Sequence, residues 1–207
     1  ASVLFGFANY PITDSVEHAE ELVRMAVERG LVLEVGHVER YNPVLGCVDE
    51  APGRPVFIEA HRLAPFPPPR PGMHPRGTEV SVILDLMIHD IDVVLSLVGE
   101  PVDRVEAVGV PILSPSVDIA NARLVFENGC VANLTASRVS AEPMRRIRLF
   151  KPCAYLSLDY QDRCGEIAYR DGMTIVRHRV PVREANALLE EVSDFCRCVD
   201  AVRGGNA

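Results

Sequence analysis

Apolar residues in the first part of the chain form two short runs separated by a helical repeat. Residues 3–8 and 31–35 are largely apolar runs of the length of a buried strand, and the segment 16–29 between them carries apolar residues at the spacing of one helix face. Residues 13–15 offer polar helix caps, and Gly30 follows the repeat. The pattern predicts a strand–helix–strand unit with parallel strands, because a crossover of this length joins strands that run in the same direction.

From residue 55 onward the pattern changes to short apolar stretches with the spacing of hairpins. Asn128-Gly129 between two of them is a strong signal for a tight β-turn. The proline-rich segment 65–75 favours a surface loop or lid over a docking site for a proline-binding partner. A last helix is expected over 184–202, with its apolar residues on one face. The expected strands are 56–61, 102–110, 119–126, 131–137, 145–150, 154–158, 166–170 and 174–181.

A further helix, around Asp85 and ending near Gly99, is apolar on most of its surface but carries an acid and an imidazole. Asp85 and His89 are four residues apart, so they share one helix face and can touch. Polar groups on an apolar helix cost free energy unless paired, and a paired acid and imidazole are the groups that proton transfer requires. The spacing leaves two interpretations open, a catalytic pair or two core side chains that satisfy each other.

Composition and charge narrow the function classes. The 207 residues are 48% hydrophobic, and the net charge of −8 without a basic cluster argues against a nucleic-acid partner. No run reaches the roughly 18 apolar residues of a membrane span, and the opening residues lack the pattern of a signal peptide. The six cysteines include no CxxC pair, so we expect reduced thiols in a cytoplasmic protein. No metal site is expected, because Asp90 and Asp92 diverge from His89 around the helix.

Several separated segments form an ordered set along the chain. They are 36–43 (Gly-His-Val-Glu-Arg-Tyr-Asn-Pro), 58–62 (Ile-Glu-Ala-His-Arg), 84–92 (Leu-Asp-Leu-Met-Ile-His-Asp-Ile-Asp), 118–122 (Asp-Ile-Ala-Asn-Ala), 128–129 (Asn-Gly) and 134–138 (Leu-Thr-Ala-Ser-Arg). Each is weak alone, but together they cover nearly the whole chain and resemble the Gfo/Idh/MocA oxidoreductases. The first segment is most similar to members that act on nucleotide-linked amino sugars.

The resemblance implies an α+β fold with two parts. Residues 1–45 would be the C-terminal remnant of a Rossmann dinucleotide-binding domain, a βαβ unit. Residues 46–207 would be the substrate-binding and oligomerisation domain, a mostly antiparallel open sheet with helices on one face. We also expect homo-oligomers formed through the open sheet, because an uncovered apolar face needs a cover.

The chemistry implied by the resemblance is hydride transfer between the carbinol carbon of a sugar or nucleotide sugar and NAD or NADP. A base must take the hydroxyl proton as the hydride leaves. His89 matches the family's proton acceptor or sugar-hydroxyl ligand, and Asp85 matches the group that orients substrate and imidazole. The candidate substrate-binding residues are His61, Arg62 and Arg138, with sheet-edge charge as the alternative for each. The candidate cofactor-binding residues are Asn9, Tyr10, Pro11, His37, Tyr41 and Asn42, of which Tyr41 and Asn42 also fit a structural junction.

Two departures from the family pattern keep a second hypothesis open. Asn9-Tyr10-Pro11 stands where the family has Glu-Lys-Pro, so the family's lysine is missing. No GxGxxG turn is present to hold a pyrophosphate at a helix N-terminus, which leads us to expect a truncated member. The alternative to an enzyme is therefore a degenerate, non-catalytic binding and oligomerisation module of the same fold.

Overall fold

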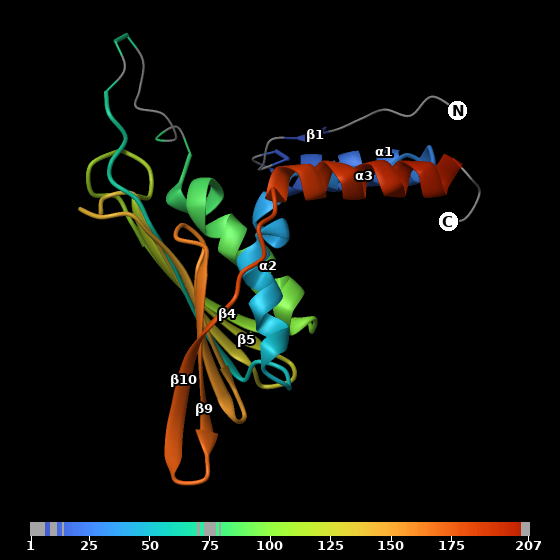
Figure 1. Cartoon of the computed structure of the whole chain (residues 1–207). Helices are drawn as coiled ribbons and strands as arrows, with labels where there is room; N and C mark the ends of the chain where they lie inside the picture. The colour runs from blue at the N-terminus through green and yellow to red at the C-terminus, as the bar shows by residue number, and fades with distance from the viewer. Residues whose placement is uncertain are drawn as a thin grey trace. The chain divides into compact units, whose positions relative to one another are not determined.

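The computed structural model of the chain describes residues 7–8, 12–13, 15–69, 71–72, 78 and 80–203, and it divides into two compact units (Figure 1). The first unit comprises residues 1–41 and 185–207, and the second comprises residues 42–184.

The first unit contains the predicted strand–helix–strand arrangement. β1 (Phe7–Ala8) pairs in parallel with β2 (Glu34–Val35), and α1 (Val16–Glu28) connects them. Ser15 caps α1 by accepting a hydrogen bond from the His18 N–H at 3.4 Å. The predicted helix and the parallel pairing are confirmed, although the second strand is only two residues long where five were expected.

A second helix and a short turn complete the first unit. α3 (Ala187–Arg203) is the C-terminal helix, and it packs against the 3-10 turn η1 (Val38–Tyr41). In α3 the buried side chains of Glu191, Phe195 and Val199 recur every four residues, so they form one helix face. An acid on this otherwise apolar face is unusual, because charged groups are rarely buried without a partner.

The second unit is a sheet of eight strands, counted over the described residues. Its order is β10-β9-β8-β7-β3-β6-β5-β4, with β3 parallel to β6 and all other neighbours antiparallel. The strands are β3 (Phe57–Leu63), β4 (Val102–Val110), β5 (Ile119–Phe126), β6 (Val131–Ser137), β7 (Met144–Lys151), β8 (Ala154–Asp159), β9 (Cys164–Asp171) and β10 (Thr174–Val180).

Side chains alternate between the two faces of this sheet. In β3 every second residue is buried, namely Ile58, Ala60 and Arg62. The buried residues of β5, β6, β7 and β8 follow the same period of two and line up beside them, so one face of the sheet forms the core. Asn128-Gly129 makes the predicted hairpin between β5 and β6, with Gly129 at a φ of +82° that favours glycine.

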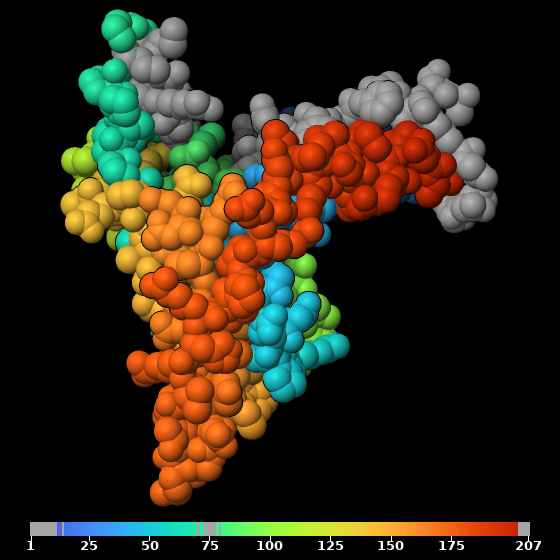
Figure 2. Space-filling model, viewed as in Figure 1, coloured from blue at the N-terminus to red at the C-terminus, as the bar shows by residue number. Residues whose placement is uncertain are grey.

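Helical segments cover the core face. They are the 3-10 helix η2 (Pro43–Glu50), the π-helical turn η3 (Ile83–Met87) and α2 (Ile88–Val98), which continues η3 and ends at Gly99 with a φ of +65°. η2 packs on β8 and β9, η3 packs on β6, and α2 packs on β3 and β6 (Figure 1). Figure 2 shows the orange β9–β10 hairpin reaching beyond these helices. The α+β class and the open sheet with helices on one face are confirmed.

Three features differ from the sequence-based expectations. The spacing suggested successive hairpins, but β3 lies between β6 and β7, far from its neighbours in the chain. The 3-10 helices over 38–50 and the π-helical turn were not predicted. Both depend on packing and on i→i+3 or i→i+5 hydrogen bonds that no apolar repeat signals. Among the described residues, no helix is long and apolar enough to cross a membrane.

Candidate functional site

The helical segment that carries Asp85 and His89 contains a π-helical turn. The Ile88 N–H donates a hydrogen bond to the carbonyl oxygen of Ile83, five residues earlier, so the helix is locally widened. Asp85 lies within this turn, and its own N–H donates to the carbonyl oxygen of Ser81 at 3.0 Å. His89 lies in the first turn of α2. Single π-helical turns inside α-helices are rare and occur often at functional sites, which makes this the first candidate for the site.

The surroundings of His89 favour its neutral form. Burial is the main cause, the nearby guanidinium of Arg145 adds to it, and the carboxylate of Asp92 opposes both, with the result that the pKa of His89 is lowered to about 4. A neutral imidazole can accept a proton, whereas a protonated one cannot. His89 is therefore in the form that a general base needs near neutral pH.

Arg62 and Asp90 join β3 to α2 through a buried ion pair. The Arg62 Nε donates to one oxygen of Asp90 at 3.1 Å and its Nη2 donates to the other at 2.9 Å. Both side chains are nearly inaccessible, at 3% and 4% exposure. The Arg62 guanidinium also lies 5.8 Å from the ring centroid of Tyr160. The predicted substrate-binding residue Arg62 thus fixes the helix that carries His89, and sugar contact by Arg62 itself stays a prediction.

Arg138, the second predicted substrate-binding arginine, is also held in a buried network. Its Nε donates to Asp118 Oδ1 at 2.8 Å, and its Nη1 donates to the Val80 carbonyl oxygen at 2.9 Å. Burial alone would raise the pKa of Asp118, but hydrogen bonds from Ser114, Arg138 and the Ile112 N–H outweigh it and lower the pKa. These contacts fasten the β4–β5 loop to the end of β6, and sugar contact by Arg138 stays a prediction.

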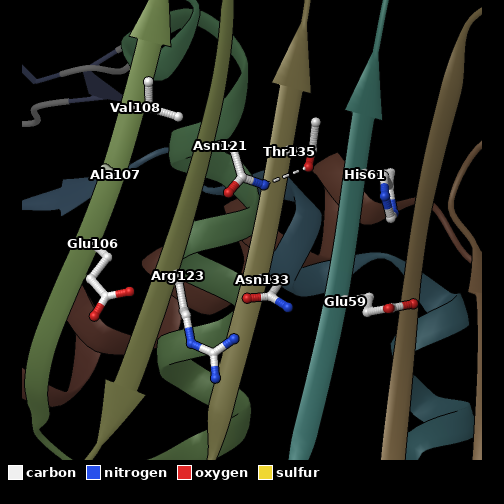
Figure 3. Close-up of a pocket in the computed structure, with 9 residues that line it drawn as sticks. All are labelled: Glu59, His61, Glu106, Ala107, Val108, Asn121, Arg123, Asn133 and Thr135. Carbon is white, nitrogen blue, oxygen red and sulfur yellow. Dashed lines mark hydrogen bonds between the residues drawn. The ribbon is translucent and has the colours of Figure 1, made fainter.

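His61 lies on the opposite side of the sheet from Arg62. Neighbouring residues of a strand point to opposite faces, and Figure 3 shows His61 on the face without helices. There it lines a hollow of about 620 Å³ together with Glu59, Arg123, Asn133 and Thr135. The sheet itself therefore separates His61 from the α2 side. The sequence already indicated this separation, because His61 and Arg62 are adjacent in a predicted strand and adjacent strand residues point to opposite faces.

We call this side of the sheet the open face and define it by Glu59, His61, Glu106, Arg123, Asn133 and Thr135 (Figure 3). A row of directly paired residues crosses it with alternating charge. The row is Glu106, Arg123, Asn133, Glu59 and Arg148. Arg148 Nη1 and Glu59 Oε2 are 3.2 Å apart, and Asn121 donates to Thr135 Oγ1 at 3.0 Å. The face is polar and charged, with exposed valines along β4 at Val108 and Val110.

Part of the predicted cofactor-binding set can be located. Asn9, Tyr10 and Pro11 lie outside the described residues. The Tyr41 hydroxyl donates to Asp194 Oδ2 in α3 at 2.8 Å, and the Asn42 side chain accepts from the Val44 N–H at the start of η2. The His37 N–H donates to the carbonyl oxygen of Val35, in the chain reversal after β2. Cofactor binding by these residues stays a prediction.

Two features of the site were missed in the sequence. Arg145 is the cross-strand partner of Arg62, and its charge acts on His89. The local sequence Arg145-Arg146-Ile147 does not show which of the two arginines faces the helix. Lys151 is the only lysine of the sequence. Its Nζ is buried and donates to the carbonyl oxygens of Val48 and Ala51 at 2.7 and 2.6 Å, so this amine anchors η2.

Comparison with known proteins places these elements in a family. The family model of the GFO/IDH/MocA C-terminal domain matches residues 48–151. UDP-N-acetylglucosamine 3-dehydrogenase of Acidithiobacillus ferrooxidans is 42% identical over 201 residues, covering 93% of this chain and 62% of the relative. A solved structure of that enzyme superposes with a TM-score of 0.82 at 39% identity, over 93% of this chain and 61% of the other.

A more distant structure shares the fold. Levoglucosan dehydrogenase in complex with NADH and levoglucosan has a TM-score of 0.70 at 17% identity, over 83% of this chain and 58% of the other. The chain thus spans less than two thirds of the length of these relatives. Because the family model matches half of the chain, the chain belongs to the Gfo/Idh/MocA family of oxidoreductases.

Proposed function

We propose that this chain is the substrate-binding portion of an NAD(P)-dependent oxidoreductase that acts on a hydroxyl of a sugar or nucleotide sugar by hydride transfer. The observation that carries the proposal is the neutral His89 next to a π-helical turn that holds Asp85. The relative at 42% identity is a dehydrogenase of UDP-N-acetylglucosamine, which supports a nucleotide sugar as substrate.

In this proposal the chain's residues handle the proton. NAD or NADP would accept the hydride from the carbinol carbon. His89 accepts the hydroxyl proton, because its lowered pKa keeps the imidazole neutral. Asp85 orients the substrate and the imidazole. The ion pair of Arg62 with Asp90 keeps α2 in place, so that His89 is presented from a rigid element.

Residues 1–45 are proposed as this chain's contribution to a larger dinucleotide-binding domain, and residues 46–207 as the substrate-binding and oligomerisation domain. The compact units divide the chain differently, because α3 belongs to the first unit. The support is the apolar face of α1, on which Val16, Val23 and Val27 are 70%, 52% and 74% exposed. Apolar helix faces are normally covered, and the parallel β1–β2 pair is the geometry of a βαβ crossover.

The open face is proposed as the contact between copies of the chain. Its alternating row of charges can pair with the same row of a second copy related by a two-fold axis. The exposed valines of β4, an edge strand, would add apolar area to this contact, because a second copy would remove them from water. His61 lies in this contact. A cytoplasmic location fits the six cysteines, all of which are free thiols.

The experiment that tests the proposal is isothermal titration of the chain with UDP-N-acetylglucosamine and, separately, with NAD and NADP. We expect the nucleotide sugar to bind and His89→Ala to weaken binding about fivefold, the worth of one hydrogen bond of about 1 kcal/mol. The matched control is His178→Ala, which changes an exposed histidine of β10. Equal affinities for the wild type and His89→Ala would remove His89 from the site.

A second candidate is a non-catalytic module that binds the nucleotide sugar without turnover. Tyr10 stands at the position of the family's lysine, and the one lysine of the chain is sealed under η2, so it cannot replace that group. Tyr10→Lys separates the two candidates. Substrate-dependent reduction of NAD that rises in this variant favours the enzyme, and binding without any reduction in either protein favours the module.

A further inference from the structure

Two arginines meet on the covered face of the sheet next to α2, and their surroundings differ. Arg62 and Arg145 are direct cross-strand partners on β3 and β7, so their side chains leave the same face. Arg62 is 2% exposed and its charge is neutralised by both oxygens of Asp90. Arg145 is exposed to solvent. The register thus places a second guanidinium beside the first, on the side of the sheet that carries His89.

The neighbours of Arg145 on its own strand have other roles. Arg146 Nη2 lies 2.9 Å from Asp159 Oδ2, and Arg148 Nη1 lies 3.2 Å from Glu59 Oε2, so both point to the open face. Of the three arginines, only Arg145 therefore points to the face that the helices cover. The sequence Arg145-Arg146-Ile147-Arg148 does not by itself show which of its three arginines faces the helices.

Arg145 is close enough to His89 for its charge to act on the imidazole. The register of β3 and β7 places Arg145 next to Arg62, and Arg62 bonds Asp90, the residue that follows His89 in α2, so the guanidinium belongs to the same site as the imidazole. Two charged groups act on His89, namely Arg145 from β7 and Asp92 from α2 itself, so Asp92 does not diverge from His89 as the sequence suggested. An exposed cation is thus set beside a neutral proton acceptor.

We propose that Arg145 binds the phosphate of a nucleotide-linked sugar and so selects an anionic substrate over a neutral one. The inference rests on the proposed function, since it assigns a substrate class to the same site. Guanidinium groups bind phosphate oxygens through two parallel charge-assisted hydrogen bonds, which neutral polyols cannot match. The only lysine of the chain is sealed under η2, so arginine is the cation this site can offer.

The test compares two probes, UDP-N-acetylglucosamine and N-acetylglucosamine, by isothermal titration against the wild type, Arg145→Gln, Arg145→Lys and the control Arg170→Gln. Arg170 is an exposed arginine of β9 whose Nε donates to the Gly172 carbonyl oxygen. We expect Arg145→Gln to weaken binding of the nucleotide sugar tenfold to a hundredfold and to leave the neutral sugar unchanged. Arg145→Lys keeps the charge and should lose less.

A second readout is independent of any ligand. Removing the cation beside His89 should raise the pKa of its imidazole, followed by NMR titration of the ring protons in Arg145→Gln, with no change in Arg170→Gln. A substitution that only loosened the fold would not produce this selective rise together with unchanged binding of the neutral sugar.

The outcomes separate this inference from the proposed function. If the wild type binds the nucleotide sugar and Arg145→Gln binds it equally well, the role of Arg145 is wrong and the proposed function stands. If the wild type binds both sugars with the same affinity, the proposed selection for an anionic substrate is wrong, and the proposed function again stands. If neither sugar binds the wild type, the proposed function fails and the inference fails with it.

Discussion

Three ionisable residues, the half-buried His89 and the buried Asp90 and Glu191, are accommodated in different ways. His89 is kept neutral, Asp90 is neutralised by a bidentate arginine, and Glu191 is 2% exposed with an Oε1 that accepts no hydrogen bond among the described residues. Burial, followed by the charge of Glu34, raises the pKa of Glu191. Each of the three predicts a different response to substitution or pH.

His89 predicts a loss of stability in mild acid. Its pKa falls from an ordinary value of about 6.5 to about 4 in the folded chain, so below about pH 6.5 the unfolded chain takes up a proton that the folded chain does not. The free energy of unfolding should therefore decrease as the pH falls from about 6.5 toward about 4. We expect a shallower decrease in His89→Gln, measured by urea unfolding at pH 7 and pH 5, whereas His178→Gln should keep the wild-type slope. Parallel slopes for the wild type and His89→Gln would contradict this.

Asp90→Asn should strongly destabilise the second unit. The substitution leaves the Arg62 guanidinium buried without its counter-charge, and breaking one side of a buried pair costs about 3–5 kcal/mol. The exposed pair of Arg104 and Glu106 on β4 is the control, since Glu106→Gln should cost less than about 1 kcal/mol. Chemical denaturation measures the free energy of unfolding of both variants. Similar decreases for the two would show that the buried ion pair contributes no more than the exposed one.

Glu191→Gln should stabilise the first unit near neutral pH. Because the folded pKa of Glu191 is raised, its charged form destabilises the fold, and this penalty shrinks as the pH falls below the folded pKa and is gone below the ordinary pKa of about 4.3. The melting temperature of Glu191→Gln should exceed that of the wild type at pH 7 and match it near pH 4. Asp200→Asn, an exposed acid on the same helix, should show no such difference. A lower melting temperature for Glu191→Gln at pH 7 would refute the prediction.

At the scale of elements, two irregular segments set the geometry of the site. The π-helical turn widens the helix where Asp85 lies, just before His89. The β4–β5 loop has little regular structure, and Asp118 organises it by accepting hydrogen bonds from the N–H groups of Ile112, Leu113 and Ser114. A single carboxylate thus replaces the hydrogen bonds that a strand or helix would provide.

Asp118→Asn should loosen this loop. The amide cannot accept all of the N–H donors and also pair with the Arg138 guanidinium, so we expect a loss of about 3–5 kcal/mol in the free energy of unfolding. Hydrogen exchange of the amides of residues 112–114 should become faster. The control is Asp103→Asn, an exposed carboxylate on β4. Unchanged exchange in Asp118→Asn would show that the loop is held by other contacts.

The strands illustrate how far local signals reach. The bounds of β4, β5 and β6 match the expected ranges 102–110, 119–126 and 131–137, because apolar alternation and the Asn128-Gly129 turn are local features. The place of β3 between β6 and β7 was not predictable, since it depends on pairing with segments more than 70 residues away in sequence.

At the scale of the whole molecule, the open face predicts self-association. Arg123→Glu reverses one charge in the alternating row and should place like charges opposite each other in a two-fold contact. We expect sedimentation velocity to show oligomers for the wild type and a shift toward monomer for Arg123→Glu. Arg29→Glu, an equal charge change at an exposed position after α1, should leave the oligomers unchanged. A monomeric wild type would exclude the proposed contact.

The sequence by itself determined the fold class, most strands, the parallel β1–β2 pair and the family, because these follow from local periodicity, turn residues and ordered motifs. It also indicated that Asp85 and His89 belong together on one helix. Only the tertiary structure decided that Arg62 and Arg138 are held in buried ion pairs, that His61 faces the other side of the sheet, and that Arg145 leaves the same face of the sheet as Arg62. The reason is physical: the charge state and the partner of a side chain depend on burial and on neighbours from distant segments, and pairing across the sheet sets both.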